Sequence, residues 1–305
     1  MICKSCSYSF LFDPQKDHLS GAVKLHDKLF EKIIRHASAD STYAFTPNQF
    51  FSSARHFGRK SRGCCLFFVI TMTAVLAMIA FTAEIPGHLI FLALIAVFLM
   101  VTLSRLGSKG PTRKAWDRFV KRWQKDGRPI PGLIDSPALQ NPPPDWEEKD
   151  IYDYGVSALL LCDRPETVDL LVLNQFHAQT NTLILTASGY PSYLLEKADS
   201  LLAQSPDLPV YLLHDPATDP GTMKNHCPLA FEAALDLGLA PHTLSQLGVL
   251  RKRFHRRELP SLPLDVMPYR TLSASLTHCL AHGLVLDSVL GAAGGPDSDT
   301  DISFG

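Results

Sequence analysis

Apolar residues are distributed very unevenly along the 305-residue chain. Between residues 64 and 103, Glu84 and His88 are the only ionisable side chains besides cysteines. The motif "EIPG" divides this segment into apolar runs of twenty and sixteen residues, and a membrane-spanning helix needs about 20. A helix in a soluble core is seldom apolar on every face, so the pattern predicts a two-helix transmembrane hairpin rather than a buried soluble one.

Basic residues flank this predicted hairpin on both sides. Residues 1–63 carry 10 basic and 5 acidic side chains, and residues 104–128 carry 9 and 2. Because Lys/Arg-rich flanks stay in the cytoplasm, the charges predict an integral protein of the inner or plasma membrane with both termini cytoplasmic. A lipid bilayer is then the first predicted partner.

Residues 104–128 predict a basic, amphipathic juxtamembrane helix with Trp116, Phe119, Val120 and Trp123 on one face. Such a helix either lies against anionic headgroups or docks on its own soluble domain. The residues predicted to face the membrane surface are Arg113, Lys114, Arg118, Lys121, Arg122 and Lys125.

The C-terminal region alternates short apolar runs with helical patterns. Residues 156–162, 182–188 and 209–215 are predicted strands, and residues 165–174 and 191–204 are predicted helices. Continuous apolar strands alternating with helices are typical of a parallel sheet covered on both faces. The predicted fold class is therefore α/β, with a parallel-sheet cytoplasmic domain.

Acidic residues follow the predicted strands, where parallel sheets bind ligands. Asp163 follows the first strand, and Asp215 and Asp219 follow the third. Carboxylates at one edge are suitable ligands for Mg²⁺, although aspartate also serves as a helix cap or turn former at such junctions. The stiff "DPATDP" loop predicts that Asp215 faces the cleft while Asp219 points away or caps the following helix.

The N-terminal region predicts a small α-rich unit. Thr46, Pro47 and Gln49 form a capping-box pattern that predicts the start of a helix. The rest of this unit is expected after the hairpin, which would make the hairpin an insertion. Cys3 and Cys6 form a CxxC, a candidate zinc half-site, but the sequence contains no second CxxC to complete four ligands.

Three segments resemble the Toprim domain of topoisomerase VI A-like proteins: "ALLLCDRPETVDLLVL", "TLILTASGYPS" and "LPVYLLHDPATDPGTM". Asp163, residues 189–192, and Asp215 with Gly221 lie at the family's acidic and glycine-containing turns. The segment "AFTPNQFF" resembles the winged-helix element that carries the family's nucleophilic tyrosine. The resemblance implies a winged-helix-like N-terminal unit, a Toprim-like domain, Mg²⁺ as cofactor and chemistry on DNA.

Three departures from this family pattern bear on catalysis. Phe50 and Phe51 stand where the family has tyrosines, so no phenolic oxygen is available for attack. Asp163 replaces a glutamate, and Asp215 and Asp219 are separated by three residues instead of one. These changes predict loss of DNA cleavage, so no residue is predicted to be catalytic.

The predicted organisation has six parts. The Pro-rich linker contains six prolines between residues 129 and 149, and the tail is small, acidic and expected to be disordered. The parts are the CxxC knuckle and first helical segment (1–63), the hairpin (64–103), the basic helix (104–128), the linker (129–150), the Toprim-like domain (151–290) and the tail (291–305).

Charge and motifs limit the predicted function. Residues 129–305 carry 10 basic and 22 acidic side chains, which disfavours nucleic acid as a partner. His278 and His282 are four residues apart, but without a nearby acid they are interpreted as partly buried histidines rather than a metal site. The favoured hypothesis is a membrane-anchored, non-catalytic binding, scaffold or regulatory protein with an unknown protein partner. The alternative is a Mg²⁺-dependent nuclease or phosphotransfer enzyme, and a transporter or channel is disfavoured.

Overall fold

The computed structural model describes residues 10–20, 23–58, 110–142, 155–254 and 257–293. The chain divides into two compact units. Unit 1 comprises residues 1–31 and 54–128, and unit 2 comprises residues 32–53 and 129–305. The division falls within two helices, α1 (Asp27–Ala37) and α2 (Pro47–Gly58).

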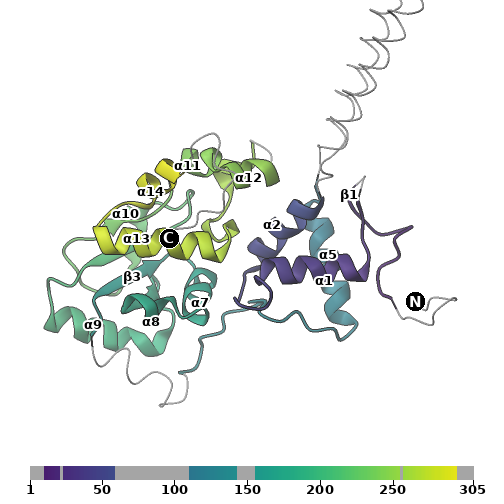
Figure 1. Ribbon diagram of the computed structural model, residues 1–305. Helices are drawn as coiled ribbons and strands as arrows, with labels where there is room; N and C mark the ends of the chain where they lie inside the picture. Colours follow the sequence, from purple (N-terminus) through teal and green to yellow (C-terminus); the bar gives the residue numbers. More distant parts are fainter. Residues whose placement is uncertain (1–9, 21–22, 59–109, 143–154, 255–256, 294–305) are drawn as a thin grey trace, which may run out of the picture. The chain divides into compact units, whose positions relative to one another are not determined.

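Unit 1 contains a short antiparallel pair, β1 (His18–Ser20) and β2 (Val23–Lys24), and the helix α5 (Arg113–Lys125) (Figure 1). Thr112 caps α5 by accepting a hydrogen bond from the Ala115 N–H. Trp116 and Trp123 lie seven residues apart on one face of α5 and are both buried. The structure therefore docks the apolar face of α5 within its own unit.

An aromatic cluster forms the core of unit 1. Trp123 stacks on Phe30 with ring centroids 4.6 Å apart and on Phe12 at 5.8 Å. The ring of Trp116 lies 5.2 Å from that of Phe30. Residues from the start of the chain and from α5 thus share one core, although about a hundred residues separate them in sequence.

Asp27 is buried at the start of α1 in unit 1. Its carboxylate accepts hydrogen bonds from the backbone N–H groups of Leu11 and Phe12 and from the Arg128 guanidinium, whose Nη1 lies 2.6 Å away. Burial alone would raise the pKa of Asp27, but the two backbone donors and Arg128 outweigh it and lower the pKa. Asp27 is therefore ionised and fully paired in the folded unit.

Unit 2 is built on a four-stranded parallel sheet in the order β4-β3-β5-β6. Leu160 at the centre of β3 pairs with Ile184 on one side and Tyr211 on the other. The strands are β3 (Ala158–Cys162), β4 (Thr182–Thr186), β5 (Val210–Leu213) and β6 (Leu235–Asp236). The predicted parallel α/β sheet and its first three strands are confirmed.

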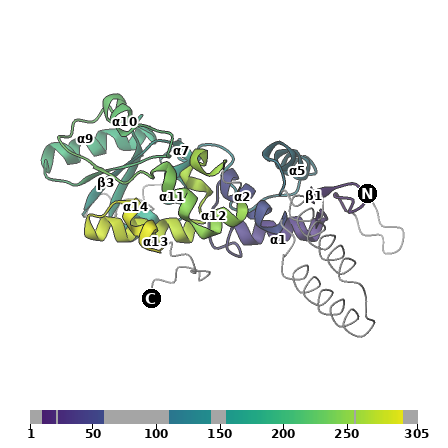
Figure 2. The ribbon, with the colours of Figure 1, turned by 90° about the horizontal axis from the view of Figure 1, so that it is seen from above.

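Helices cover both faces of this sheet (Figure 2). Leu159, Leu161 and their neighbours in β4 and β5 pack against Ala198 and Leu202 of α9, and α13 lies on the opposite side. The helices are α7 (Pro165–Leu173), α8 (Phe176–Thr180), α9 (Leu195–Gln204), α10 (Pro220–His226), α11 (Pro241–Gln246), α12 (Gly248–Arg253), α13 (Tyr269–His282) and α14 (Leu286–Ala293), with 3-10 turns η1 (Ser192–Leu194), η2 (Leu259–Ser261) and η3 (Leu264–Val266).

Residues 44–49 of unit 2 begin α2 as the sequence predicts. Phe45 forms a parallel bridge with Leu133. The Gln49 N–H donates to Thr46 Oγ1 at 3.2 Å, and the Thr46 N–H donates to Gln49 Oε1 at 3.1 Å. These reciprocal bonds are a capping box, so this prediction is confirmed.

The predicted membrane component requires correction. Within the described ranges, no helix is long and apolar enough to cross a bilayer, and even α13 has only 14 residues where about 20 are needed. This finding contradicts the hairpin as part of the fold class, the description as a membrane protein and the predicted integral location. The segment on which that prediction depends, residues 64–103, lies outside the described residues.

Candidate functional site

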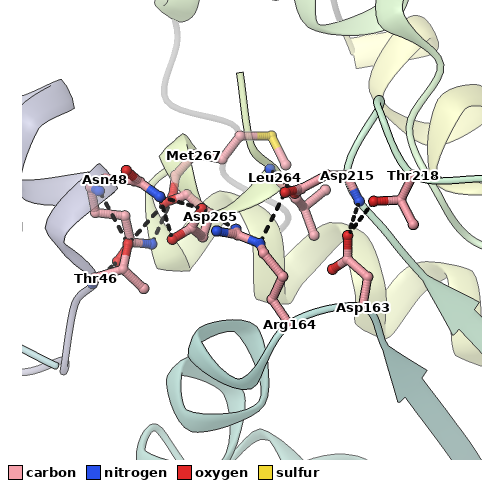
Figure 3. A network of polar contacts seen from close by, with 10 residues as sticks. Thr46, Asn48, Asp163, Arg164, Asp215, Thr218, Leu264, Asp265 and Met267 are labelled. Atoms are coloured by element: carbon pink, nitrogen blue, oxygen red, sulfur yellow. Dashed lines mark hydrogen bonds and ion pairs between the residues drawn. The ribbon is translucent and has the colours of Figure 1, made fainter. Parts of the chain in front are cut away.

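The carboxyl ends of β3 and β5 bring Asp163 and Asp215 together (Figure 3). The Asp215 N–H donates to Asp163 Oδ2 at 2.8 Å, and the Thr218 hydroxyl donates to the same oxygen at 2.9 Å. Because the two strands are parallel neighbours, the residues that follow them must lie at the same edge. One oxygen of Asp163 is therefore already engaged by the β5 loop.

Arg164 lies between two carboxylates at this edge (Figure 3). It precedes α7, and its Nη2 lies 2.5 Å from Asp265 Oδ1. Its Nε lies 2.9 Å from Asp215 Oδ2, a contact that is an ion pair but lacks hydrogen-bond geometry. The two paired carboxylates are 14% and 0% exposed, so water screens these interactions little.

Asp265 connects the edge to the start of α2. Asn48 Nδ2 donates to both carboxylate oxygens of Asp265 at 3.0 Å. The Thr46 hydroxyl donates to the Asp265 carbonyl at 3.2 Å, and Gln49 Nε2 donates to the Met267 carbonyl at 2.7 Å. We call Asp163, Arg164, Asp215 and Asp265, with Asn48, the Arg164 network.

Asp215 has an unusual environment within the Arg164 network. Burial raises its pKa, Arg164 opposes that rise, and the nearby charges of Asp163 and Asp265 add to it, for a pKa of about 6. The Leu264 N–H also donates to Asp215 Oδ1, at 2.6 Å. The pKa of Arg164 rises because the attraction of Asp265 and Asp215 exceeds the effect of its own burial. One guanidinium thus pairs with more than one carboxylate, which explains why Asp215 binds a proton readily.

His214 fixes the position of the β5 loop beside the network. Its Nδ1 lies 2.8 Å from the Asp215 carbonyl oxygen and its Nε2 lies 2.9 Å from Asp236 Oδ1. Gly238 permits this arrangement, because a Cβ atom there would lie 2.0 Å from His214 Nε2. The imidazole therefore links β5 to the short edge strand β6.

Asp219 does not join the other predicted metal ligands. It caps α10, accepting from the Thr222 N–H and hydroxyl at 2.7 Å each, and these bonds lower its pKa. The prediction that Asp219 caps the following helix is therefore confirmed. Sequence reasoning missed Arg164, Asp265 and Asn48; the one available signal was Asp265 as the single charge in "LPLDVMP".

The network does not fit a magnesium ion. Mg²⁺ needs free oxygen ligands in near-octahedral geometry, whereas the carboxylates bind Arg164, Asn48, Thr218 and backbone N–H groups. Among the described residues, no group of three or more His, Cys, Asp or Glu side chains is arranged to hold a metal. Cys3 and Cys6 lie outside the described residues.

The phenylalanines and histidines singled out in the sequence pack against other aromatic rings. Phe50 and Phe51 are buried, with Phe50 against Phe45 and Phe51 against Phe254. The rings of His278 and His282 lie 4.3 Å apart on α13.

The basic residues of α5 divide into paired and exposed side chains. Arg113 pairs with Asp117, and Arg122 pairs with Asp17. The four remaining basic residues are exposed: Lys114, Arg118, Lys121 and Lys125. A role for all six at a lipid surface stays a prediction.

No family model, curated protein or solved structure matches this chain. The Toprim resemblance accordingly rests on the three segments quoted above and stays a prediction. Function has to be inferred from the geometry of unit 2.

Proposed function

We propose that this chain carries a Toprim-like domain that no longer performs metal-dependent chemistry and acts as a binding, scaffold or regulatory protein. The observation that carries the proposal is the position of Arg164 between Asp215 and Asp265. A guanidinium supplies the positive charge that a divalent ion would otherwise bring to clustered carboxylates. The buried Phe50 and Phe51 support the proposal, since neither offers a nucleophilic oxygen.

The network also has a structural role in this proposal. Through Asp265 and Asn48 it ties the start of α2 to the loop before α13, and through Asp215 it ties that loop to β5. Breaking a buried, hydrogen-bonded charge pair costs roughly 3 to 5 kcal/mol because an uncompensated charge remains. The sheet edge of a metal enzyme is thus proposed to have become a support for a binding surface.

Cation titration with a melting-temperature readout tests the proposal. Mg²⁺ or Mn²⁺ at millimolar concentration should leave the melting temperature of the wild-type chain unchanged, because a ligand stabilises only through a site. Arg164→Ala should lower stability in the absence of divalent ions and recover part of it when Mn²⁺ is added. Arg270→Ala, which removes an exposed arginine of α13, is the matched control and should do neither.

The alternative function, a Mg²⁺-dependent nuclease or phosphotransfer enzyme, predicts the opposite result. Wild-type protein would then be stabilised by Mg²⁺ or Mn²⁺, and Asp215→Ala would abolish that stabilisation. Cleavage of DNA or RNA by the wild-type chain, lost in the same variant, would also overturn the non-catalytic proposal.

A further inference from the structure

The last turn of α13 carries two histidines on one face of the helix. His278 and His282 are four residues apart, which makes them neighbours on a helix surface. Their ring centroids lie 4.3 Å apart, and the ring planes are inclined by 39°. His282 is exposed and His278 is half-buried. The pair therefore lies at the surface of unit 2, where an ion from solution can reach it.

The hydrogen bond of His282 determines which of its ring nitrogens carries a lone pair. Its Nδ1 lies 3.0 Å from the carbonyl oxygen of His278, and a carbonyl oxygen can only accept. The neutral imidazole therefore has its proton on Nδ1 and its lone pair on Nε2. Metal-binding histidines usually donate their second nitrogen to a backbone carbonyl or a carboxylate in this way, which holds the ring in place.

The separation of the two rings suits a shared metal ion. Imidazole nitrogens bind Zn²⁺ at about 2.0–2.1 Å, so two imidazoles on one ion have centroids roughly 4.5 to 5 Å apart. A small rotation of either side chain reaches this separation from the observed 4.3 Å. A chelate uses one nitrogen of each ring, so a hydrogen bond of the other nitrogen is compatible with it. Because the helix sets the spacing in advance, the entropic cost of binding is reduced.

The position at the end of α13 also favours a cation. His282 is the last residue of the helix, and the N–H of Gly283 donates to the Cys279 carbonyl to close it. The carbonyl groups at the end of a helix carry a partial negative charge. Arg270 is the only lysine or arginine in α13, eight residues before His278, or about 12 Å along the axis. An ion at the histidine pair therefore meets the negative end of the helix without a nearby positive side chain of α13.

Imidazole ligands select the class of metal. They suit Zn²⁺, Cu²⁺ and Ni²⁺, whereas Mg²⁺ and Mn²⁺ prefer oxygen ligands. Two histidines four residues apart on one helix face are a recurring zinc-binding arrangement. In the part of the chain that the structure describes, no group of three or more candidate ligands is arranged to hold a metal. The remaining coordination positions would therefore be filled by water or by a ligand from another molecule.

We propose that His278 and His282 form an open chelate site for a divalent transition metal of the Zn²⁺ and Cu²⁺ class. The interpretation of both as partly buried histidines applies to His278 alone, because His282 is exposed. The site has nitrogen ligands on α13, whereas the Arg164 network consists of carboxylates around a guanidinium. The two proposals therefore stand or fall separately, and Mg²⁺ or Mn²⁺ titration does not test this one.

Titration of the full chain with Cu²⁺, followed by NMR, is the first test. Cu²⁺ is paramagnetic, so a small fraction of one equivalent should broaden the amide signals around the end of α13 first. A background of Cys3→Ser and Cys6→Ser removes the other candidate metal ligands. His226→Ala is the matched control: His226 is exposed at the end of α10 and its Nδ1 lies 2.7 Å from the Thr222 carbonyl, but no histidine precedes it by four residues. Broadening that is centred away from α13, or that persists in His282→Ala, would overturn the proposal.

Zn²⁺ affinity measured by calorimetry in the same background is the second test, and it separates a chelate from two independent histidines. The second imidazole binds the ion intramolecularly, so His278→Ala and His282→Ala should each weaken the affinity about tenfold or more. A chelate is lost with either ring, so the double variant should bind no more weakly than the single variants. His226→Ala should leave the affinity unchanged. Undiminished affinity in either single variant, or additive losses in the double variant, would contradict the chelate.

Discussion

The two units bury different kinds of side chain and carry opposite charge. Unit 1 is organised around stacked aromatic rings, whereas the core of unit 2 is largely leucine on a parallel sheet. Unit 1 contains 17 basic and 7 acidic residues, and unit 2 contains 12 and 23. A nearly neutral chain is therefore made of a basic and an acidic part, and charge-based reasoning has to be applied to each separately.

Buried aspartates show the same contrast at atomic scale. Asp27 in unit 1 is bound by Arg128 and two backbone N–H groups, and its pKa is lowered. Asp215 in unit 2 shares Arg164 with other carboxylates, and its pKa is raised to about 6. Burial raises the pKa of both residues, so the backbone donors at Asp27 and the neighbouring carboxylates at Asp215 decide the direction.

The largest expected effect separates the two cores. Trp123→Ala should destabilise unit 1 by roughly 3 to 5 kcal/mol, because it removes a large buried ring between Phe12 and Phe30. Urea unfolding in a Trp146→Phe background, monitored by tryptophan fluorescence, reports the unfolding of unit 1. Amide exchange of β3 reports unit 2 and should stay protected. Equal loss of protection in β3 would show that the two units unfold as one.

Asp27→Asn should cost roughly 3 kcal/mol in unit 1, since the buried carboxylate binds both Arg128 and the N–H groups of Leu11 and Phe12. Asp126→Asn is the matched control, because Asp126 pairs with the same Arg128 but its side chain is 45% exposed. The control should change the free energy of unfolding by less than about 1 kcal/mol. Similar losses in both variants would mean that burial of the Asp27 pair is energetically unimportant.

Acidification should affect the units in opposite directions. A raised pKa means that the folded state of unit 2 holds the Asp215 proton more tightly than the unfolded state does. The free energy of unfolding of unit 2 should therefore be highest below about pH 4. It should fall by roughly 3 kcal/mol as pH rises through about 6. The contribution of Asp27 has the opposite sign and is lost as pH falls below the ordinary aspartate range.

Urea unfolding at pH 5 and pH 7, followed by amide exchange of β3, measures the Asp215 contribution in unit 2. Histidines also titrate in this range, so the informative quantity is the difference between wild type and Asp215→Asn, whose unit 2 should respond less to pH. An identical pH response in the two proteins would contradict the raised pKa of Asp215.

The smallest expected effect concerns the start of α2. Thr46→Ala removes the hydroxyl that accepts from the Gln49 N–H and donates to the Asp265 carbonyl. It should lower the free energy of unfolding by about 1 to 2 kcal/mol. Thr46→Ser keeps the hydroxyl and should retain most of the stability by the same urea measurement. If serine fails to restore it, the methyl group rather than the cap is responsible.

Local patterns predicted much of unit 2. The apolar runs of β3, β4 and β5, the capping box at Thr46 and the helix cap at Asp219 depend on neighbouring residues, so the sequence reveals them. The strand β6 has only two residues, and one of them is Asp236. It could not be predicted because its pairing depends on β5 being in place.

The candidate site was predicted only in part for the same reason. Asp163 and Asp215 follow predicted parallel strands, which places them at one edge. Arg164 and Asp265 are separated by 101 residues, and their contact depends on how the loop before α13 folds back. No spacing rule relates them, so the position of Arg164 between two carboxylates becomes visible only in three dimensions.

The charge at the centre of the Arg164 network belongs to the polypeptide itself. A bound ion comes and goes with its concentration, whereas Arg164 is present in every copy from the moment of synthesis. Chelators and changes in salt composition therefore have no species to remove from this site. Protons remain as a physiological signal that alters its balance, because burial raises the pKa of Asp215 to about 6, and a single codon change at position 164 would remove the central positive charge.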